Sequence, residues 1–185
     1  MTSKNWWRIF NTQLVKNTND KTKQAWSDAI TKRFINWLSN QHYIVRIGIY
    51  ASLKNEVNTN QLIAFLLNQH YEVYLPVITN LSTNQMQFSK INNFDYDYSI
   101  LKGIKQPTNK QWIKPNELDL IIIPVCGFDA NKYRIGKGLG YYDKYLKQTN
   151  AIKVGFAFNI VRCFSFKIDV NDVPLDLIMT ESEII

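Results

Sequence analysis

Cysteine is scarce in this 185-residue sequence, which contains only Cys126 and Cys163. Two cysteines can form one disulfide bond at most, and their spacing matches no zinc-binding motif. Both stand in apolar runs, where a cysteine usually packs as a small hydrophobic side chain. The sequence therefore excludes a disulfide-stabilised scaffold and a cysteine-rich zinc fold, and we expect a reducing compartment.

Long hydrophobic runs are also missing. No stretch approaches the roughly 20 apolar residues that a membrane-spanning helix needs. The segment Met1–Val15 has no continuous apolar region followed by a small-residue cleavage site, so it does not resemble a secretory signal. We expect a soluble, cytoplasmic protein without a membrane partner, and a monomer, because the sequence contains no heptad pattern.

Glycine and proline are few, with seven and five copies, which excludes a collagen-like chain. Hydrophobic residues make up 45% and charged residues 20% of the sequence, as in ordinary globular proteins rather than disordered ones. A chain of this length has room for one packed core. We therefore expect a single domain over residues 1–185.

Positive charge exceeds negative charge: 22 lysines and arginines face 15 aspartates and glutamates, a net charge of +7. This excess favours anionic partners such as nucleotides, polyglutamates, RNA or acidic lipid. The basic residues are scattered, and no block of five or six like charges is present. A basic RNA-binding protein remains an alternative, but we expect no nucleic-acid partner.

The hydrophobic pattern predicts an α/β fold. Apolar residues recur at helical spacing in an N-terminal region of about 3–40, and strand-like and helical segments alternate in a core of about 43–185. The expected helices are at 3–16, at 20–40, after Asn58 or Thr59, and at 141–147. The expected strands are at 43–50, 71–77, near 86–88, at 118–125, 152–158 and 177–180. We expect a three-layer α/β/α architecture, with a mostly parallel, open, Rossmann-like sheet and N-terminal helices.

The segment Gly127–Leu146 carries the clearest chemical signal. It follows the most apolar strand and precedes a helix, which is where open α/β sheets bind ligands. Gly136, Gly138 and Gly140 alternate, so the main chain there can adopt positive φ angles and approach a ligand closely. A glycine-rich loop that leads into a helix presents N–H groups to an anion.

Charged residues surround these glycines. Arg134 and Lys137 supply positive charge for phosphate oxygens, and Asp143, one turn into the helix, is a type of residue that holds Mg²⁺. The loop matches neither the Walker A motif nor the dinucleotide-binding pattern, and a flexible loop that ends in a helix cap would look similar. The combination of strand, arginine, glycines and helix favours a phosphate site.

Five segments in this order resemble one known family. They are Lys4–Arg8, Ile49–Thr59, Gly103–Pro107, Phe128–Asp143 and Asp172–Glu181. Together they are similar to the motifs of the 5-formyltetrahydrofolate cyclo-ligases, also called 5,10-methenyltetrahydrofolate synthetases, over nearly the whole chain. Lys132, Leu139, Gln106 and residues 125–127 depart from that family's usual pattern, but none of these departures removes a group that the chemistry requires.

The resemblance implies an ATP-dependent ligase of one-carbon metabolism. The γ-phosphoryl group of MgATP would be transferred to the N5-formyl oxygen of 5-formyltetrahydrofolate. N10 would then attack the activated carbon, giving 5,10-methenyltetrahydrofolate, ADP and phosphate. Alignment and charge neutralisation dominate such phosphoryl transfers. The implied partners are ATP, Mg²⁺ and a folate that can be polyglutamylated.

The resemblance also implies roles for individual residues. Arg134, Lys137 and Tyr141 would act in catalysis. ATP would be held by Lys4, Arg8, Arg134, Ile135, Gly136, Lys137, Gly138, Leu139, Gly140, Tyr141 and Tyr142. The folate would contact Ala51, Glu56, Lys137, Gly138, Leu139, Gly140 and Tyr141, with Glu56 accepting hydrogen bonds from the pterin N–H groups. Asp143 and Asp172 would support Mg²⁺.

Two other readings remain open besides an RNA-binding protein. One is a different nucleotide-dependent transferase, which would use the same loop for ATP and ignore reduced folates. The other is a folate- or nucleotide-binding regulator without turnover. The presence of Lys137, Glu56 and Asp143 together argues against that regulator, because it would not need the charged groups of the reaction.

Overall fold

The computed structural model of the chain describes residues 2–185. Four α-helices, two short 3₁₀ helices (η1, Pro115–Glu117, and η2, Asn159–Val161) and eleven strands follow one another within these residues. The α-helices are α1 (Lys4–Asn17), α2 (Asp20–Leu38), α3 (Asn60–Asn68) and α4 (Tyr141–Leu146). The strands are β1 (Arg46–Gly48), β2 (Glu72–Asn80), β3 (Gln85–Ile91), β4 (Tyr98–Leu101), β5 (Ile104–Pro107), β6 (Trp112–Ile113), β7 (Leu120–Pro124), β8 (Gly127–Phe128), β9 (Arg134–Ile135), β10 (Ile152–Phe156) and β11 (Leu177–Met179).

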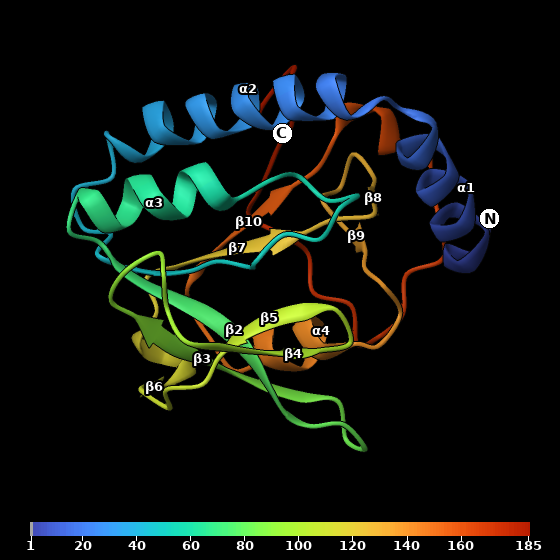
Figure 1. The fold of residues 1–185 in the computed structure, drawn as a ribbon. Coiled ribbons are helices and arrows are strands. Elements are labelled where there is room, and N and C mark those ends of the chain that lie inside the picture. The colour runs from blue at the N-terminus through green and yellow to red at the C-terminus, as the bar shows by residue number, and fades with distance from the viewer. Residues whose placement is uncertain (1) are drawn as a thin grey trace.

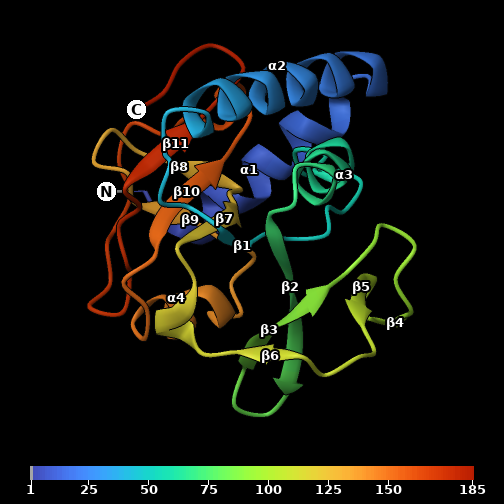
Figure 2. The same ribbon diagram turned by 90° about the vertical axis from the view of Figure 1, so that its left-hand side faces the viewer.

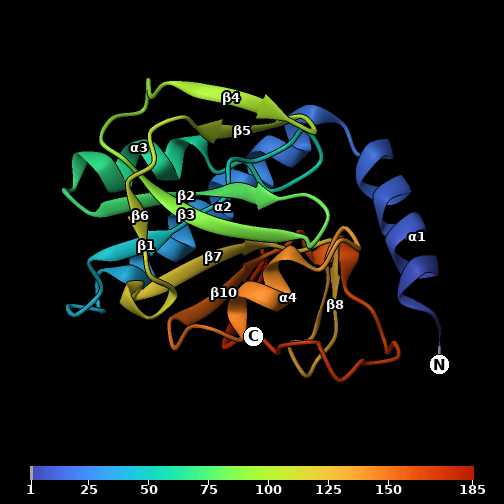
Figure 3. The same ribbon diagram turned by 90° about the horizontal axis from the view of Figure 1, so that it is seen from below.

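Seven strands form the central sheet in the order β11-β10-β7-β1-β2-β3-β6. The five strands from β11 to β2 are parallel, and β3 and β6 add an antiparallel edge. Helices α2 and α3 lie on one face of the sheet and α4 lies on the other, while α1 packs at one end (Figures 1 and 3). The predicted α/β class with a mostly parallel sheet is confirmed.

The core is built from the apolar patterns of the sequence. Strand β7 is deeply buried. Its first four residues, Leu120 to Ile123, are fully shielded from solvent, as expected of a central parallel strand that is covered on both faces. On α2, Ile30 and Phe34 recur every four residues and are fully buried, and the Phe34 ring meets the edge of Phe156 from β10. Burial of these side chains ties the N-terminal helices to the sheet.

Strand β1 is shorter than predicted. Extended structure was expected over 43–50, but the strand covers only Arg46–Gly48. Ile49 still donates a backbone hydrogen bond to Tyr74, and the chain then leaves the sheet. This early exit carries residues 50–56 over the carboxyl edge of the sheet, where they form one wall of a cavity.

A hairpin was missed in the polar region 79–116. Strands β4 and β5 pair with each other in a separate two-stranded sheet beside β2 and β3 (Figures 1 and 2). The residues of β4 are mostly exposed, so they show no apolar alternation that would mark a strand. The hairpin adds a second wall to the cavity.

Candidate functional site

One cavity of about 360 Å³ lies where the parallel strands end. Ala51 follows β1, Pro76 belongs to β2 and Pro124 ends β7, so the cavity opens at the carboxyl edge of the central strands. Ligands bind at this edge in open α/β folds because chain connections diverge there. The glycine-rich loop 136–140 and helix α1, through Lys4 and Arg8, complete the enclosure.

The glycine loop is held by Arg8 from α1. The Arg8 Nε group donates a hydrogen bond of 2.8 Å to the carbonyl oxygen of Gly136. Gly138 has φ +92°, and a Cβ atom there would lie 3.3 Å from the guanidinium carbon of Arg8. Gly140 has φ +71°. Positive φ is thus confirmed at Gly138 and Gly140, whereas the prediction is wrong for Gly136, which does not adopt a positive φ.

The helix that follows the loop is shorter than an anion site requires. Helix α4 spans six residues, from Tyr141 to Leu146, which is less than two turns. A helix dipole sums over aligned peptide units, so such a helix provides little of it. The attraction for an anion at this loop therefore comes mainly from side-chain cations and individual N–H groups.

Arg134 is the most deeply buried of these cations. Its side chain is only 3% exposed and forms an ion pair of 3.0 Å with Asp143 of α4. The Tyr142 ring lies 5.9 Å from the guanidinium carbon, within the range of a cation–π contact. The Arg134 Nε group is buried without a partner in the described structure. This N–H donor of the guanidinium group therefore remains available to a ligand.

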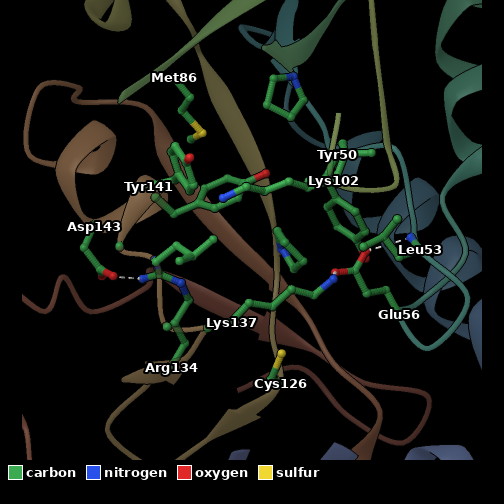
Figure 4. Close-up of a pocket in the computed structure, with 18 of the residues that line it drawn as sticks. Tyr50, Leu53, Glu56, Met86, Lys102, Cys126, Arg134, Lys137, Tyr141 and Asp143 are labelled. Atoms are coloured by element: carbon green, nitrogen blue, oxygen red, sulfur yellow. Dashed lines mark hydrogen bonds and ion pairs between the residues drawn. The ribbon is translucent and has the colours of Figure 1, made fainter. Parts of the chain in front are cut away.

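Lys137 reaches across the cavity to Glu56. Their Nζ and Oε1 atoms are 2.7 Å apart, and the Glu56 side chain is mostly buried. The second carboxylate oxygen of Glu56 accepts a 2.8 Å hydrogen bond from the backbone N–H of Leu53. Figure 4 shows this pair bridging the loop that follows β1 and the glycine loop. Lys137, predicted to contact both ATP and the folate, and Glu56, predicted to contact the folate, thus meet directly.

Lys4 is paired with two carboxylates at the N-terminus of α1. Its Nζ group forms an ion pair with Asp172 and lies 3.4 Å from Asp169. Trp7 of the same helix donates through Nε1 to the carbonyl oxygen of Ser165. These contacts hold the start of α1 against the chain segment 165–172 and place Lys4 at the border of the cavity.

The two predicted metal ligands do not meet in a preformed cluster. Asp143 is engaged by Arg134 and Asp172 by Lys4. Within residues 2–185 no group of three metal-binding side chains comes together. Mg²⁺ is often held by one or two carboxylates together with substrate phosphates. The donor set therefore fits a metal that arrives with a nucleotide, and the magnesium site stays a prediction.

The remaining cavity wall is largely apolar and carries neutral phenols. Tyr50 donates its hydroxyl to the carbonyl oxygen of Val57 at 2.9 Å, and burial raises its pKa well above the usual range. Burial, and secondarily the charge of Glu56, also raises the pKa of Tyr142. The hydroxyls of Tyr141 and Tyr142 are buried without partners in the described structure. These rings can therefore pack on a flat ligand without adding negative charge.

Cys126 also lines this cavity. It is half-buried, whereas Cys163 is fully buried as expected for both cysteines. Burial is the main factor that raises the pKa of the Cys126 thiol. A thiol with a raised pKa is a poor nucleophile at neutral pH, so the arrangement offers cations, carboxylates and glycines rather than a covalent catalyst.

Nearly all predicted site residues gather at this one cavity. The lining includes Lys4, Arg8, Ala51, Glu56, Arg134, Gly136, Lys137, Gly138, Leu139, Gly140, Tyr141, Tyr142, Asp143 and Asp172. Ile135 is the exception, because its side chain is fully buried in a small cluster with Cys163 and Phe166. Residues that sequence reasoning missed come from β2, β3 and the β4–β5 hairpin; they include Ile78, Met86, Lys102, Ile104 and Gln106.

Comparison with known proteins assigns the family. A model of the 5-formyltetrahydrofolate cyclo-ligase family matches residues 2–181. The chain belongs to this family. A curated 5-formyltetrahydrofolate cyclo-ligase from Mycoplasma pneumoniae is 33% identical over 160 residues, which cover 82% of each chain. A cyclo-ligase from Mycoplasma genitalium is 31% identical over 169 residues, 87% of each chain.

Solved structures agree with this assignment. A 5,10-methenyltetrahydrofolate synthetase from Mycoplasma pneumoniae superposes with a TM-score of 0.81 at 26% identity, covering 97% of this chain and 99% of the other. The NMR structure of the Aquifex aeolicus synthetase gives a TM-score of 0.83 at 24% identity, covering 98% and 91%, and supports the shared fold. The expected enzyme class, a cyclo-ligase of folate and one-carbon metabolism, is confirmed. No helix within residues 2–185 has the length and apolar character to cross a membrane.

Proposed function

We propose that this cyclo-ligase converts 5-formyltetrahydrofolate to 5,10-methenyltetrahydrofolate and consumes ATP, releasing ADP and phosphate. The observation that carries the proposal is a single cavity with two chemically different halves. One half has Arg8, Arg134 and Lys137 around a glycine loop, and the other has apolar walls beside the Glu56 carboxylate. Two substrates with opposite requirements can therefore be bound side by side.

The charged half suits the triphosphate of ATP. Arg8 and Arg134 are fixed by the Gly136 carbonyl and by Asp143, so their remaining donors are preoriented. Preoriented charge stabilises a transferring phosphoryl group without a reorganisation cost during the reaction. Gly138 and Gly140 let the main chain approach the phosphates, because no Cβ intervenes. Lys4 at the border of the cavity adds a further cation.

The apolar half suits the pterin ring of the folate. The ring's amino and N–H groups are donors, and an ionised Glu56 offers only acceptors, so the two are complementary. Leu53 already fixes one Glu56 oxygen through its backbone N–H. When a triphosphate draws Lys137 toward the loop, the other Glu56 oxygen becomes available to the ring. Tyr141 and the neighbouring apolar walls then pack on the ring face.

The reaction begins with transfer of the γ-phosphoryl group to the N5-formyl oxygen. The bond between the γ-phosphorus and the bridging oxygen of ADP breaks, and a new phosphorus–oxygen bond forms on the formyl group. Arg134 and Lys137 neutralise the charge on the transferring group, and alignment supplies most of the rate enhancement. Tyr141, which lines the cavity with its hydroxyl buried, would cover the formyl group and exclude water from it.

Ring closure completes the reaction. The lone pair of N10 attacks the activated formyl carbon, the N10 proton is lost to solvent, and the carbon–oxygen bond breaks. Phosphate leaves with the oxygen atom that belonged to the formyl group. Asp143 and Asp172 would hold Mg²⁺ on the nucleotide phosphates, directly or through water, and this ion would supply charge neutralisation there.

An absorbance assay tests the proposal. Purified protein, 5-formyltetrahydrofolate and MgATP should produce the near-ultraviolet absorbance of the methenyl product, with one ADP formed for each product molecule. ADP formation without methenyl product would instead favour a different nucleotide-dependent transferase. No absorbance change with folded protein and both substrates would overturn the proposed function.

A matched pair of lysine variants tests the role of the loop. Lys137→Ala should lower kcat/KM for ATP roughly 100-fold, because it removes a cation aimed at the transferring group. Lys147→Ala is the control: this exposed residue bonds to Asn171, and its loss should change kcat/KM less than twofold. Equal effects of the two substitutions would contradict a specific phosphate site at the loop.

A further inference from the structure

The β4–β5 hairpin ends in a two-residue turn made of Lys102 and Gly103. Leu101 pairs with Ile104, so only these two residues connect the strands. Both have positive φ angles, +51° for Lys102 and +79° for Gly103, as a type I′ turn requires. Asparagine, aspartate or glycine normally occupies the first position of this turn, because other side chains are strained there. A lysine at this position is therefore not explained by the needs of the turn.

The hairpin is anchored to the wall of the cavity. The side-chain oxygen of Gln106 accepts a 2.9 Å hydrogen bond from the backbone N–H of Ile78 on β2. Gln106 is only 3% exposed, so this bond is shielded from water. Ile104, Gln106 and Ile78 all line the cavity. The anchor fixes the position of the turn, and with it the side chain of Lys102, at the cavity's edge.

The Lys102 ammonium group has no protein partner among residues 2–185. The other lysines of the cavity, Lys4 and Lys137, form ion pairs with carboxylates. Lys102 lines the same cavity, and Figure 4 shows it between Tyr50 and Tyr141. An unpaired cation at a strained turn, directed at a binding cavity, is a ready binding group for an anionic part of a ligand.

We propose that Lys102 binds a carboxylate of the glutamate tail of the folate substrate. This inference rests on the proposed function, because it assigns one more contact to the same cavity. It makes the β4–β5 hairpin an element of specificity, which distinguishes a folate from a pterin derivative without glutamate. The cation and the carboxylate would form a partly exposed, charge-assisted hydrogen bond.

The position of Lys102 favours a carboxylate over a phosphate. The predicted phosphate ligands come from α1, β9 and the glycine loop. Lys102 comes from the hairpin beside β2, whose cavity residues Pro76, Ile78 and Ile104 are apolar and suit the ring system of the folate. A folate that lies on these residues extends its charged tail outward, since the tail carboxylates keep their solvent contact at the rim.

Binding measurements on Lys102→Asn test this inference. Asparagine fits the first position of a type I′ turn, so the variant should fold with an unchanged or higher Tm. Without nucleotide, its Kd for 5-formyltetrahydrofolate should rise about two- to fivefold in titration calorimetry, the range expected for a partly exposed charged contact. Its Kd for the primary amide of 5-formyltetrahydropteroate, in which a neutral carboxamide replaces the glutamate and no tail carboxylate remains, should equal that of the wild type.

Lys105→Gln is the matched control on the same hairpin. The Lys105 ammonium lies 4.4 Å from the centroid of the Tyr98 ring and does not line the cavity, yet its substitution removes the same charge. This variant should bind both ligands as the wild type does. A weaker affinity for folate in Lys105→Gln, equal to that in Lys102→Asn, would reduce the effect to general electrostatic attraction and overturn the inference.

Three further results would overturn it. The first is an equal loss for the pteroate amide and the folate, which would place Lys102 on the ring system. The second is a loss only for a non-hydrolysable ATP analogue, which would make Lys102 a phosphate ligand. The third is no loss of affinity at all. Failure of the proposed function is distinguishable, because wild-type protein would then not bind the folate, whether or not it binds the ATP analogue. Wild-type binding with an unaffected Lys102→Asn variant would reject the Lys102 contact alone.

Discussion

Gly138 shows how one residue's backbone fixes another residue's charge. Its φ of +92° turns the loop toward α1, and the absent Cβ leaves room for the Arg8 guanidinium. Arg8 in turn donates to the Gly136 carbonyl. The orientation of the cation therefore depends on a position where only glycine combines the required φ with the required space.

Gly138→Ala should weaken both stability and nucleotide binding. Alanine is strained at this φ, and its Cβ would approach Arg8 at 3.3 Å, so we expect a loss of about 1–2 kcal/mol in the free energy of unfolding. Gly136→Ala has an ordinary φ and open space around its Cβ, so its stability should change less. Thermal unfolding of the two variants measures the difference. A lower Tm for Gly136→Ala than for Gly138→Ala would contradict this account.

Sequence reasoning found the residues whose type and spacing carry the chemistry, and it missed those whose role comes from the fold. Arg134, Lys137 and the glycines are recognisable because their pattern is local. Lys102 and Gln106 lie in a polar region without periodicity. They reach the cavity only because β5 pairs with β4 and the resulting hairpin bonds to β2 through Gln106. The Lys137–Glu56 ion pair was likewise invisible, because it joins segments 81 positions apart in numbering.

At the scale of elements, α1 reaches the site through a buried asparagine. The Asn11 side chain is 1% exposed and donates to the carbonyl oxygens of Cys126 at 3.0 Å and Val161 at 3.1 Å. A Cβ at Gly127 would lie 2.7 Å from its nitrogen, so the glycine makes room for this contact. The helix that carries Lys4 and Arg8 is thereby fixed to the strands around the loop.

Asn11→Ala should therefore loosen α1. It leaves two carbonyl oxygens without this donor, which costs about 1–3 kcal/mol. The Tm should fall by several degrees, and KM for ATP should rise more than KM for the folate, because Arg8 belongs to the loosened helix. Asn17→Ala, at the exposed end of the same helix, is the control for helix propensity. An unchanged KM for ATP in the destabilised Asn11 variant would contradict the prediction, because nucleotide binding would then not depend on the packing of α1.

The central strands are also joined at the end away from the site. Asp119, just before β7, accepts hydrogen bonds from the backbone N–H groups of Val45 and Arg46 and from the Arg46 side chain. Burial alone would raise the pKa of Asp119, but the hydrogen bonds from Arg46 and Val45 outweigh it and lower the pKa. This carboxylate connects the start of β7 to the start of β1.

The lowered pKa of Asp119 predicts an acid-dependent loss of stability. The folded carboxyl group takes up its proton at a lower pH than the unfolded one, so its contribution is complete above the ordinary pKa and is lost as pH falls through the lowered value. Asp119→Asn should be about 1 kcal/mol less stable at pH 7. Its urea midpoint should also fall less than that of the wild type between pH 5 and pH 3. Parallel midpoint curves for the two proteins would contradict this role.

Helices and strands with a regular apolar pattern could be predicted from the sequence, whereas those that depend on contacts between distant segments could not. Helix α2 and strand β7 were predicted within a few residues, because burial imposes a regular apolar pattern on them. Strand β1 was predicted too long, since its apolar run continues past Gly48 into the loop that lines the cavity. Strand β4 packs by pairing with β5 rather than by apolar alternation, so its sequence carries no periodic signal.

At the scale of the whole molecule, the fold brings two chemistries to one edge of the sheet. The strands β1 and β7 end there and β2 passes beside it, and α1, the glycine loop and the hairpin surround the same space (Figure 1). The single domain over residues 1–185 remains a prediction, as do the monomeric state and the cytoplasmic location. Everything proposed for catalysis depends on a formyl oxygen that lies within reach of a transferring phosphoryl group.

Isotope transfer tests that claim most directly. The folate would be labelled with ¹⁸O in its N5-formyl group and incubated with the protein and MgATP in unlabelled water, and the released phosphate would be analysed by mass spectrometry. Phosphoryl transfer to the formyl oxygen predicts one ¹⁸O atom in each phosphate molecule formed. Methenyl product accompanied by unlabelled phosphate would show that ATP does not activate the formyl oxygen, and would contradict the account.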